Sequence, residues 1–213
     1  MLKKSDVNKI IKLLEESYPE PICALDFRKD YELLFAARLA AQCTDARVNT
    51  VTPVLYNRYP TLEALAGADI TELEDIVHSC GFYKVKARDI IAASAMLISE
   101  FNGRVPDTME ELLRLPGVGR KTANLILGDV FNKPAVVVDT HCIRLTNRIG
   151  MVDTKDPVKI ETELRKVLPP EKSSDFCHRL VLHGRVVCTA RKPACSRCCL
   201  AGICKYVKQP AGQ

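Results

Sequence analysis

The 213-residue chain has 47% hydrophobic and 27% charged residues, which is the composition of an ordinary globular protein and argues against wholesale disorder. Its net charge of +5 is unevenly distributed, because residues 1–113 carry 13 Lys and Arg against 18 Asp and Glu, whereas residues 114–213 carry 18 against 8. A basic half suggests a polyanionic partner such as nucleic acid, although a solvated basic surface would have the same composition. The length allows one large domain or two small lobes.

The sequence shows neither a secretory signal peptide nor a membrane-spanning run. The N-terminal sequence MLKKSDVNKI has lysines but no apolar region behind them, so it does not resemble a secretory signal peptide. No run approaches the roughly 18 apolar residues that a membrane span needs. We therefore expect a cytoplasmic protein that is not secreted and has no membrane partner. In a reducing compartment, the ten cysteines are more typical of metal binding than of disulfides.

Helical periodicity dominates the chain. Apolar residues at three- and four-residue spacings predict helices over 31–42, 48–59 and 86–101. Two pairs, Thr71 with Glu74 and Thr108 with Glu111, match the capping box that begins a helix. The strand-like stretch 134–139 is too short and too isolated to build a sheet. The predicted fold class is all-α.

Residues 111–131 predict a helical hairpin, with a helix that ends near Leu115, a tight turn of sequence PGVG and a second helix from about Arg120. The two glycines of the turn permit positive φ and a close approach of the backbone to another molecule. Amides at the start of a helix bind anions, and a DNA phosphate would fit there without any reading of base sequence. A plain helix corner with a glycine-rich bend is the alternative. The residues expected to contact phosphate are Gly117, Val118, Gly119 and Arg120.

Lys121 lies in the first turn of the second helix of this hairpin. An amine there feels the positive end of the helix dipole and the charge of Arg120, and both favour its neutral form. A lysine that is neutral part of the time is a nucleophile that can form a Schiff base. The alternative is that Lys121, like Arg120, only contacts phosphate.

A second candidate group follows the apolar run 135–138. Asp139 precedes a predicted helix that begins at Thr140, and capping of that helix would be enough to explain it. If the carboxylate also faces Lys121, it could take the proton of the amine and stabilise positive charge on a sugar as its base departs. His141 and Arg144 lie on the same helix and could hold a phosphate, whereas a core or surface histidine is the alternative for His141.

Four cysteines with the spacing C-x6-C-x2-C-x5-C lie near the C-terminus, namely Cys188, Cys195, Cys198 and Cys204. This spacing suits either an iron–sulfur cluster or a four-thiolate zinc site. The adjacent Cys199 leaves the register of the ligands ambiguous. Arg191 and Lys192 lie between the first two cysteines, and a bound metal would turn this loop into a rigid phosphate-binding finger.

The motifs LPGVGRKTA, VVVDTH and LHGR, followed by the cysteine spacing, closely resemble the endonuclease III family of helix-hairpin-helix DNA glycosylases. The segments AAQCTDARVN (40–49) and GFYKVKA (81–87) extend the resemblance over nearly the whole chain. It implies two helical lobes: a barrel over 22–131 with the hairpin at about 108–128, and a lobe of 1–21 plus 132–213 that holds a 4Fe–4S cluster. It also implies that the ligands are Cys188, Cys195, Cys198 and Cys204, which sets Cys199 aside and favours iron over zinc.

The resemblance also implies a reaction on double-stranded DNA that contains damaged bases or abasic sites. The lysine that matches Lys121 attacks the sugar C1′ of a flipped-out nucleotide, and the aspartate that matches Asp139 assists it. A Schiff base forms as the base leaves, and β-elimination then cuts the strand 3′ to the abasic site. Oxidised pyrimidines are the expected substrates, and a monomer associated with the nucleoid is the expected form.

Further DNA contacts are implied in the same way. Gln42 matches a residue that fills the space vacated by the flipped base, and Phe82 matches a bulky wedge. Asp45 and His141 match positions that line the pocket or its phosphate.

Three alternatives remain at this point. Adenine glycosylases of oxidised mismatches and thymine–guanine mismatch glycosylases share much of the pattern, but both typically lack the lysine that this chain has as Lys121. A non-catalytic DNA-binding module held by zinc would bind duplex with strong salt dependence and leave damaged DNA uncut. Lys121 together with Asp139 argues against this module, because phosphate binding needs no carboxylate.

Overall fold

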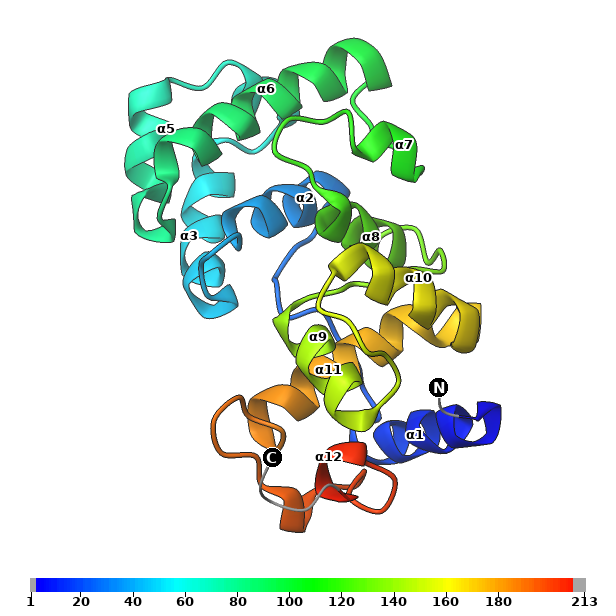
Figure 1. Cartoon of the computed structure of the whole chain (residues 1–213). Coiled ribbons are helices and arrows are strands. Elements are labelled where there is room, and N and C mark those ends of the chain that lie inside the picture. Colours follow the sequence, from blue (N-terminus) through cyan, green and yellow to red (C-terminus); the bar gives the residue numbers. More distant parts are fainter. Residues whose placement is uncertain (1–2, 209–213) are drawn as a thin grey trace. The chain divides into compact units, whose positions relative to one another are not determined.

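The computed structural model describes residues 3–208, and the chain divides into two compact units. Unit 1 comprises Met1–Ile22 and Lys133–Gln213, and unit 2 comprises Cys23–Asn132. All regular elements over residues 3–208 are helical and none is a strand, which confirms the predicted all-α class (Figure 1). No helix within this range is long and apolar enough to cross a lipid bilayer.

Unit 2 is built around helix α2, which is apolar on more than one face. Its buried residues include Leu33, Leu34, Phe35 and Leu39, so it lies inside a shell of other helices, as expected of a helix that is apolar nearly all round. Helices α3, α6 and α8 pack against it. The elements of the unit are α2 (Asp30–Leu39), α3 (Asp45–Arg58), α4 (Leu62–Ala66), α5 (Ile70–Val77), η1 (His78–Cys80), α6 (Tyr83–Phe101), α7 (Met109–Leu112) and α8 (Arg120–Asp129).

Helix starts in unit 2 follow local side-chain capping. Thr108 caps α7 as predicted, because its hydroxyl oxygen accepts from the backbone N–H of Glu111 at 3.3 Å. The predicted capping box of Thr71 and Glu74 is wrong. Helix α5 begins at Ile70, two residues before the start at Glu72 that a Thr71 cap would give, since the carboxylate of Asp69 accepts from the N–H of Glu72 at 2.9 Å. An aspartate is as good a cap as a threonine, and here it lies two residues upstream.

Unit 1 joins the N-terminal helix to the C-terminal third of the chain. Helix α11 packs against both α1 and α9, and α12 packs against α9. The strand-like run 135–138 is buried but pairs with no strand within the described residues. The elements of the unit are α1 (Lys4–Ser17), α9 (Thr140–Ile149), α10 (Pro157–Val167), η2 (Pro170–Lys172), α11 (Ser173–Val186), η3 (Cys195–Arg197) and α12 (Lys205–Lys208).

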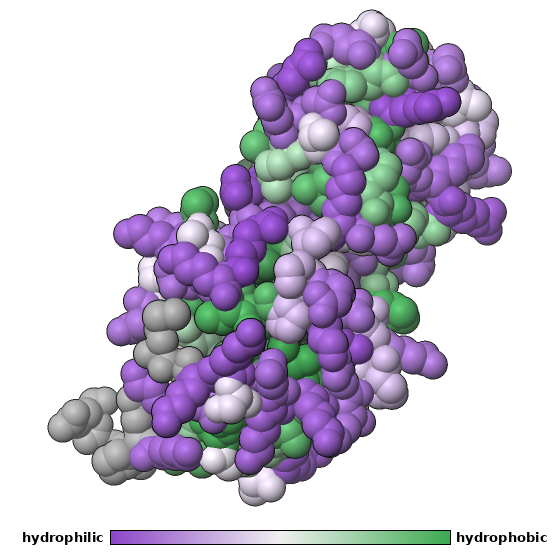
Figure 2. All heavy atoms as spheres, turned by 90° about the vertical axis from the view of Figure 1, so that its right-hand side faces the viewer, coloured by the Kyte–Doolittle hydropathy of each residue, from purple (hydrophilic) through white to green (hydrophobic). Residues whose placement is uncertain are grey.

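The face shown in Figure 2 is largely polar, because hydrophilic side chains cover most of it and hydrophobic atoms appear in limited areas. The apolar faces of the helices are therefore used mainly for packing within each unit.

Candidate active site

The connection between the two helices of the hairpin in unit 2 is longer than the sequence pattern predicts. Helix α7 ends at Leu112, three residues before the predicted end at Leu115, and α8 begins at Arg120 as predicted. Gly117 has φ of +74°, but Gly119 has φ of −101°, which any residue can adopt. Of the two glycines in the turn, only Gly117 therefore has a backbone conformation that is unfavourable for residues with a Cβ atom.

Gly117 also allows a close contact beneath the turn. A Cβ atom at this position would lie 2.6 Å from both Arg38 Nε and Asp89 Oδ2. These two atoms form an ion pair at 2.6 Å, and both side chains are largely buried. The turn consequently lies directly on an ion pair between α2 and α6, which fixes its position within unit 2.

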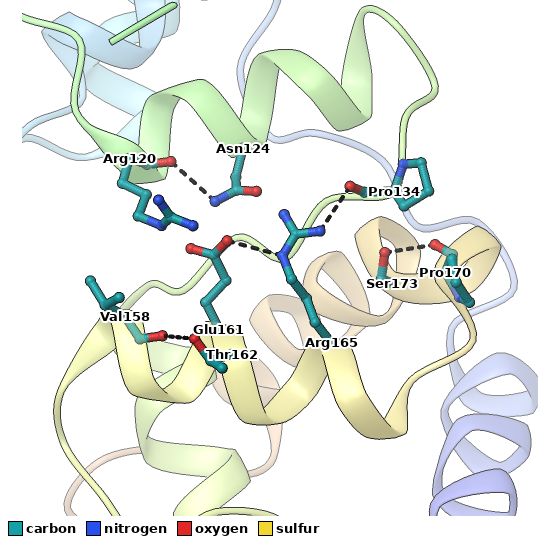
Figure 3. A network of polar contacts seen from close by, with 9 residues as sticks. All are labelled: Arg120, Asn124, Pro134, Val158, Glu161, Thr162, Arg165, Pro170 and Ser173. Atoms are coloured by element: carbon teal, nitrogen blue, oxygen red, sulfur yellow. Dashed lines mark hydrogen bonds and ion pairs between the residues drawn. The ribbon is translucent and has the colours of Figure 1, made fainter. Parts of the chain in front are cut away.

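Lys121 is the second residue of α8, and its side chain is exposed. The inner face of the same turn is held in place by buried Ala123 and Asn124, and the amide of Asn124 donates to the carbonyl of Arg120 at 3.2 Å (Figure 3). The N-cap residue, Gly119, has no side chain with which to cap the first amides of α8. An amine and a row of helix N-terminal amides are thus presented on one exposed turn, which suits an anionic ligand.

Asp139 of unit 1 caps α9, as its place in the sequence predicts. Its Oδ1 accepts from the N–H of Cys142 at 2.7 Å, and the residue is half-buried. The segment that leads to it is held at its start by Arg165 of α10, which donates to the carbonyl of Pro134 at 3.3 Å and to Glu161 at 3.0 Å (Figure 3). The carboxylate therefore has a defined direction at the N-terminus of α9.

His141 and Arg144 lie together on α9, with Arg144 Nη2 at 3.0 Å from His141 Nδ1. The guanidinium of Arg144 also donates to the carbonyl of Gly184 in the last turn of α11 at 3.1 Å, and to that of Cys188, two residues after this helix, at 3.0 Å. Its observed contacts thus connect α9 to the first cysteine of the cluster motif. The role in phosphate binding that the sequence predicts for Arg144 stays a prediction.

Gly184 has a packing role that sequence reasoning missed. A Cβ atom on this residue would lie 2.3 Å from His141 Nδ1 and 2.9 Å from Arg144 Nη2. Helix α11 can approach α9 this closely only because Gly184 has no side chain. The motif LHGR contains this glycine, but nothing in its local pattern indicates which residue lies opposite.

Gln42 and Phe82 of unit 2 share an unusual backbone conformation. Gln42 has φ of 55° and Phe82 has φ of 48°, and both lie in the left-handed region that residues with a Cβ seldom occupy. Both side chains are exposed, and Phe82 is 67% exposed. Asp45 is the first residue of α3 and is half-buried. Non-glycine residues held in this region are frequent at functional sites.

The cysteine motif forms the loop between α11 and α12 in unit 1. Cys188 Sγ accepts from Arg148 Nη1 at 3.3 Å, and Cys204 Sγ lies 3.4 Å from the carbonyl of Arg148. Arg148 also donates to the carbonyls of Thr189 and Ala190, each at 2.8 Å, so it holds the start of the loop. This role of Arg148 was not predicted. Beyond that point of the loop, Arg191 and Lys192 are exposed.

The loop has the donor set that an iron–sulfur cluster requires. Burial raises the pKa of Cys198 to about 11, and the neighbouring Cys199, Cys188 and Cys204 contribute to the rise. Positively charged iron would hold the cysteines of the motif as thiolates. Over residues 3–208 no three His, Cys, Asp or Glu side chains converge on a single metal ion. An iron–sulfur cluster contains several iron atoms, so its thiolate ligands need not converge on a single point. The residues fit a cluster bound by four thiolates.

Comparison with known proteins identifies relatives over nearly the whole chain. Residues 35–170 match the HhH-GPD superfamily base excision DNA repair protein, and residues 188–204 match the iron–sulfur binding domain of endonuclease III. Endonuclease III of Synechocystis sp. is 47% identical and the match covers 95% of this chain and 93% of that protein. Endonuclease III of Escherichia coli is 38% identical, with 96% and 97% covered. A trapped endonuclease III–DNA covalent intermediate is 40% identical, with a TM-score of 0.92 and 98% of both chains covered.

Proposed function

Because the chain belongs to the endonuclease III family of HhH-GPD base excision DNA repair proteins, and is thus a DNA glycosylase with a 4Fe–4S cluster, we propose that it is bifunctional. It removes oxidised pyrimidines from duplex DNA and then cleaves the strand 3′ to the abasic site. The observation that carries this proposal is the exposed amine of Lys121 in the first turn of α8, beside the helix N-terminal amides. This turn offers a nucleophile next to a phosphate-binding backbone.

Lys121 is the nucleophile in this proposal. Its neutral amine forms a bond to C1′ of a flipped-out nucleotide, and the bond between C1′ and the base nitrogen breaks. The base leaves with that electron pair and takes up a proton. Opening of the sugar ring gives a Schiff base between Lys121 and C1′. Loss of a proton from C2′ then expels the 3′ phosphate, which cuts the strand. The target atom is reachable only when the base has left the duplex.

Asp139 is proposed to assist Lys121. A carboxylate can accept the proton that the attacking amine loses, and it can stabilise positive charge on the sugar as the base departs. The cap that Asp139 forms on α9 supports this role, because a group with a fixed direction does not need to reorganise during the reaction.

DNA binding is proposed to use groups of both units. In unit 2 the turn before α8 contacts phosphate without reading base sequence, and the exposed Gln42 and Phe82 enter the duplex at the lesion. In unit 1, Arg191 and Lys192 contact the phosphate backbone. Asp45 and His141 are each proposed to contact the extruded nucleotide or its phosphate. We propose that the protein acts as a monomer on nucleoid DNA in the cytoplasm.

The cluster is proposed to be bound by Cys188, Cys195, Cys198 and Cys204. When bound, it cross-links the loop between α11 and α12 through iron–thiolate bonds. Arg148 holds the same loop from α9 through the carbonyls of Thr189 and Ala190. Together these contacts would present Arg191 and Lys192 on a rigid surface. Charges that are fixed in this way contact phosphate at a lower entropic cost than charges on a mobile segment.

Borohydride trapping tests the proposal directly. The purified protein is incubated with duplexes that carry an oxidised pyrimidine, no damage or an abasic site, and covalent adducts are counted on a denaturing gel. We expect an adduct on the first and third duplexes that disappears in Lys121→Ala. The matched control is Lys12→Ala, an exposed lysine of α1, which should trap as well as the wild type. Release of free base without any adduct would show a monofunctional glycosylase, and release of neither would contradict the proposal.

A further inference from the structure

A buried lysine joins the two loops that carry Gln42 and Phe82. The first loop is residues 40–44, between α2 and α3, and the second is residues 81–82, between η1 and α6. Lys86, the fourth residue of α6, is only 1% exposed. Its ammonium donates to three main-chain carbonyls, those of Leu39, Ala41 and Cys80, each at 2.8 Å. An ammonium has three N–H donors, so these contacts use its full hydrogen-bonding capacity.

The three carbonyls lie in these two loops or on the residue directly before them. Leu39 is the last residue of α2, and the carbonyl of Ala41 immediately precedes Gln42. Cys80 is the last residue of η1 and lies two residues before Phe82. The two loops are far apart in the sequence, and one ammonium holds both of them.

A positive charge suits this place. Carbonyls at the end of a helix have no intrahelical donor and carry the negative end of the helix dipole, so a buried cation satisfies them better than a neutral donor would. Burial lowers the pKa of Lys86, as expected of a cation that is removed from water. Such burial is unfavourable unless the hydrogen bonds are complete, and here they are.

Each of the two loops contains one residue with an unfavourable backbone conformation that other contacts must stabilise. Gln42 and Phe82 have φ of 55° and 48°, and both side chains are exposed, so their own packing contributes little to holding them there. The left-handed region is unfavourable for residues with a Cβ atom, and such residues stay in it only when neighbouring contacts impose it. The hydrogen bonds of Lys86 to Ala41 and Cys80 are contacts of this kind.

We propose that Lys86 is a positioning residue for base extrusion, which holds Gln42 and Phe82 in the geometry needed to enter the duplex at a lesion. This inference rests on the proposed function, because the roles of Gln42 and Phe82 in DNA binding are part of it. Lys86 touches neither DNA nor the reacting atoms. It acts through the backbone of the two loops.

The proposal predicts a selective loss of activity. Excision of a base-paired lesion requires extrusion, whereas attack on a preformed abasic site has no base to unpair. In Lys86→Met, which keeps the length of the side chain but removes its donors, we expect single-turnover excision to fall by about tenfold or more, and trapping at an abasic site by less than about threefold. Lys86→Gln keeps two donors and should lie between wild type and Lys86→Met. If Lys86→Met does not fold, the same two rates are measured on Lys86→Gln instead.

A double-mutant cycle separates this role from general destabilisation. In a Gln42→Ala/Phe82→Ala background, Lys86→Met should cause little further loss of excision, because the side chains it positions are gone. Tyr56→Phe is the matched control, since it removes another hydrogen bond in unit 2, from the Tyr56 hydroxyl to the carbonyl of Glu32 at 2.8 Å. It should leave the ratio of excision to trapping unchanged. Equal losses from Lys86→Met in both backgrounds, or on both substrates, would overturn the proposal.

A fluorescent base analogue placed opposite the lesion distinguishes failure of this inference from failure of the proposed function. Its signal reports unstacking on binding and does not require chemistry. If the wild type unstacks the analogue in a Lys86-dependent way but forms no adduct, the positioning role stands and the proposed lyase reaction fails. If the wild type forms the adduct and Lys86→Met unstacks the analogue as fully as the wild type does, the positioning role fails alone.

Discussion

The first turns of α6 and α8 in unit 2 contain the same kind of residue in opposite environments. Lys86 of α6 is buried and gives all three of its hydrogen bonds to carbonyls, whereas Lys121 of α8 is exposed. The residues before each helix differ as well. Helix α6 follows Phe82 in a left-handed conformation, and α8 follows Gly119 in an extended one. The same amine therefore supports the backbone at one helix start and is available to a ligand at the other.

The difference shows that position in a helix does not determine what a lysine does. Both amines lie in a first turn, where the helix dipole disfavours a cation. At α6 the carbonyls of two loops outweigh this effect, and they come from segments that are distant in sequence. Two further pairs of identical residues also have different surroundings, namely Cys198 with Cys199 and Gly117 with Gly119.

The largest expected effect is on the two lysines themselves. Lys121→Met should reduce strand cleavage by more than about a thousandfold, because the nucleophile is lost, while the melting temperature stays near that of the wild type. Lys86→Met should instead lower the free energy of unfolding by about 2–4 kcal/mol, because buried carbonyls lose their donors. Urea unfolding and a gel assay of cleavage on both variants check this. A strongly destabilised Lys121→Met would show that this exposed lysine also supports the fold.

The second pair is Cys198 and Cys199 in unit 1. Cys198→Ala should lose the iron and the order of residues 188–204 together, because Leu200 and Cys204 are the buried side chains of this loop and packing alone offers little support. Cys199→Ala should keep its iron. Iron content and amide hydrogen exchange of the loop measure both outcomes. A metal-replete, ordered Cys198→Ala would contradict the ligand assignment.

The third pair is Gly117 and Gly119 in the hairpin. Gly117→Ala should cost about 1–3 kcal/mol of stability and weaken duplex binding, because φ is positive and the new Cβ would meet Arg38 and Asp89. Gly119→Ala should change stability by less than about 0.5 kcal/mol, since φ is −101° and a Cβ atom there would point into open space, with no atom of another segment within 4 Å. Thermal unfolding of the two variants is sufficient. Equal costs would mean that the turn is not held by the ion pair below it.

The smallest effect is a pH dependence that comes from Lys86. Burial lowers its pKa from the ordinary value of 10.5, so between the lowered pKa and 10.5 the unfolded chain binds more protons than the folded chain. Stability therefore rises with pH across this alkaline window, and the cost of burying the cation is fully present below it. The difference in unfolding free energy between wild type and Lys86→Met, measured at several alkaline pH values, should grow with pH. A constant difference would show that the lysine keeps its ordinary pKa.

Signals between residues that are close in the sequence were sufficient to predict several features of this protein. The all-α class, the start of α8 at Arg120 and the caps formed by Thr108 and Asp139 depend on residues within a few positions of one another, so the sequence alone determined them. Local rules failed where two signals competed. Thr71 matches a capping box, but the observed helix begins at Ile70, so Thr71 lies inside its first turn and Asp69 is the cap.

Other features depend on contacts between segments that are distant in the sequence, so no local pattern predicts them. The sequence treats Gly117 and Gly119 alike, but Arg38 and Asp89 lie under the first of them. It contains no pattern that relates Lys86 to Ala41, or Gly184 to His141. These contacts form when helices from separate parts of the chain pack, and the energy of a buried polar group depends on which partners that packing supplies. The sequence therefore determined which groups can do chemistry, and the packing decided which are exposed to do it.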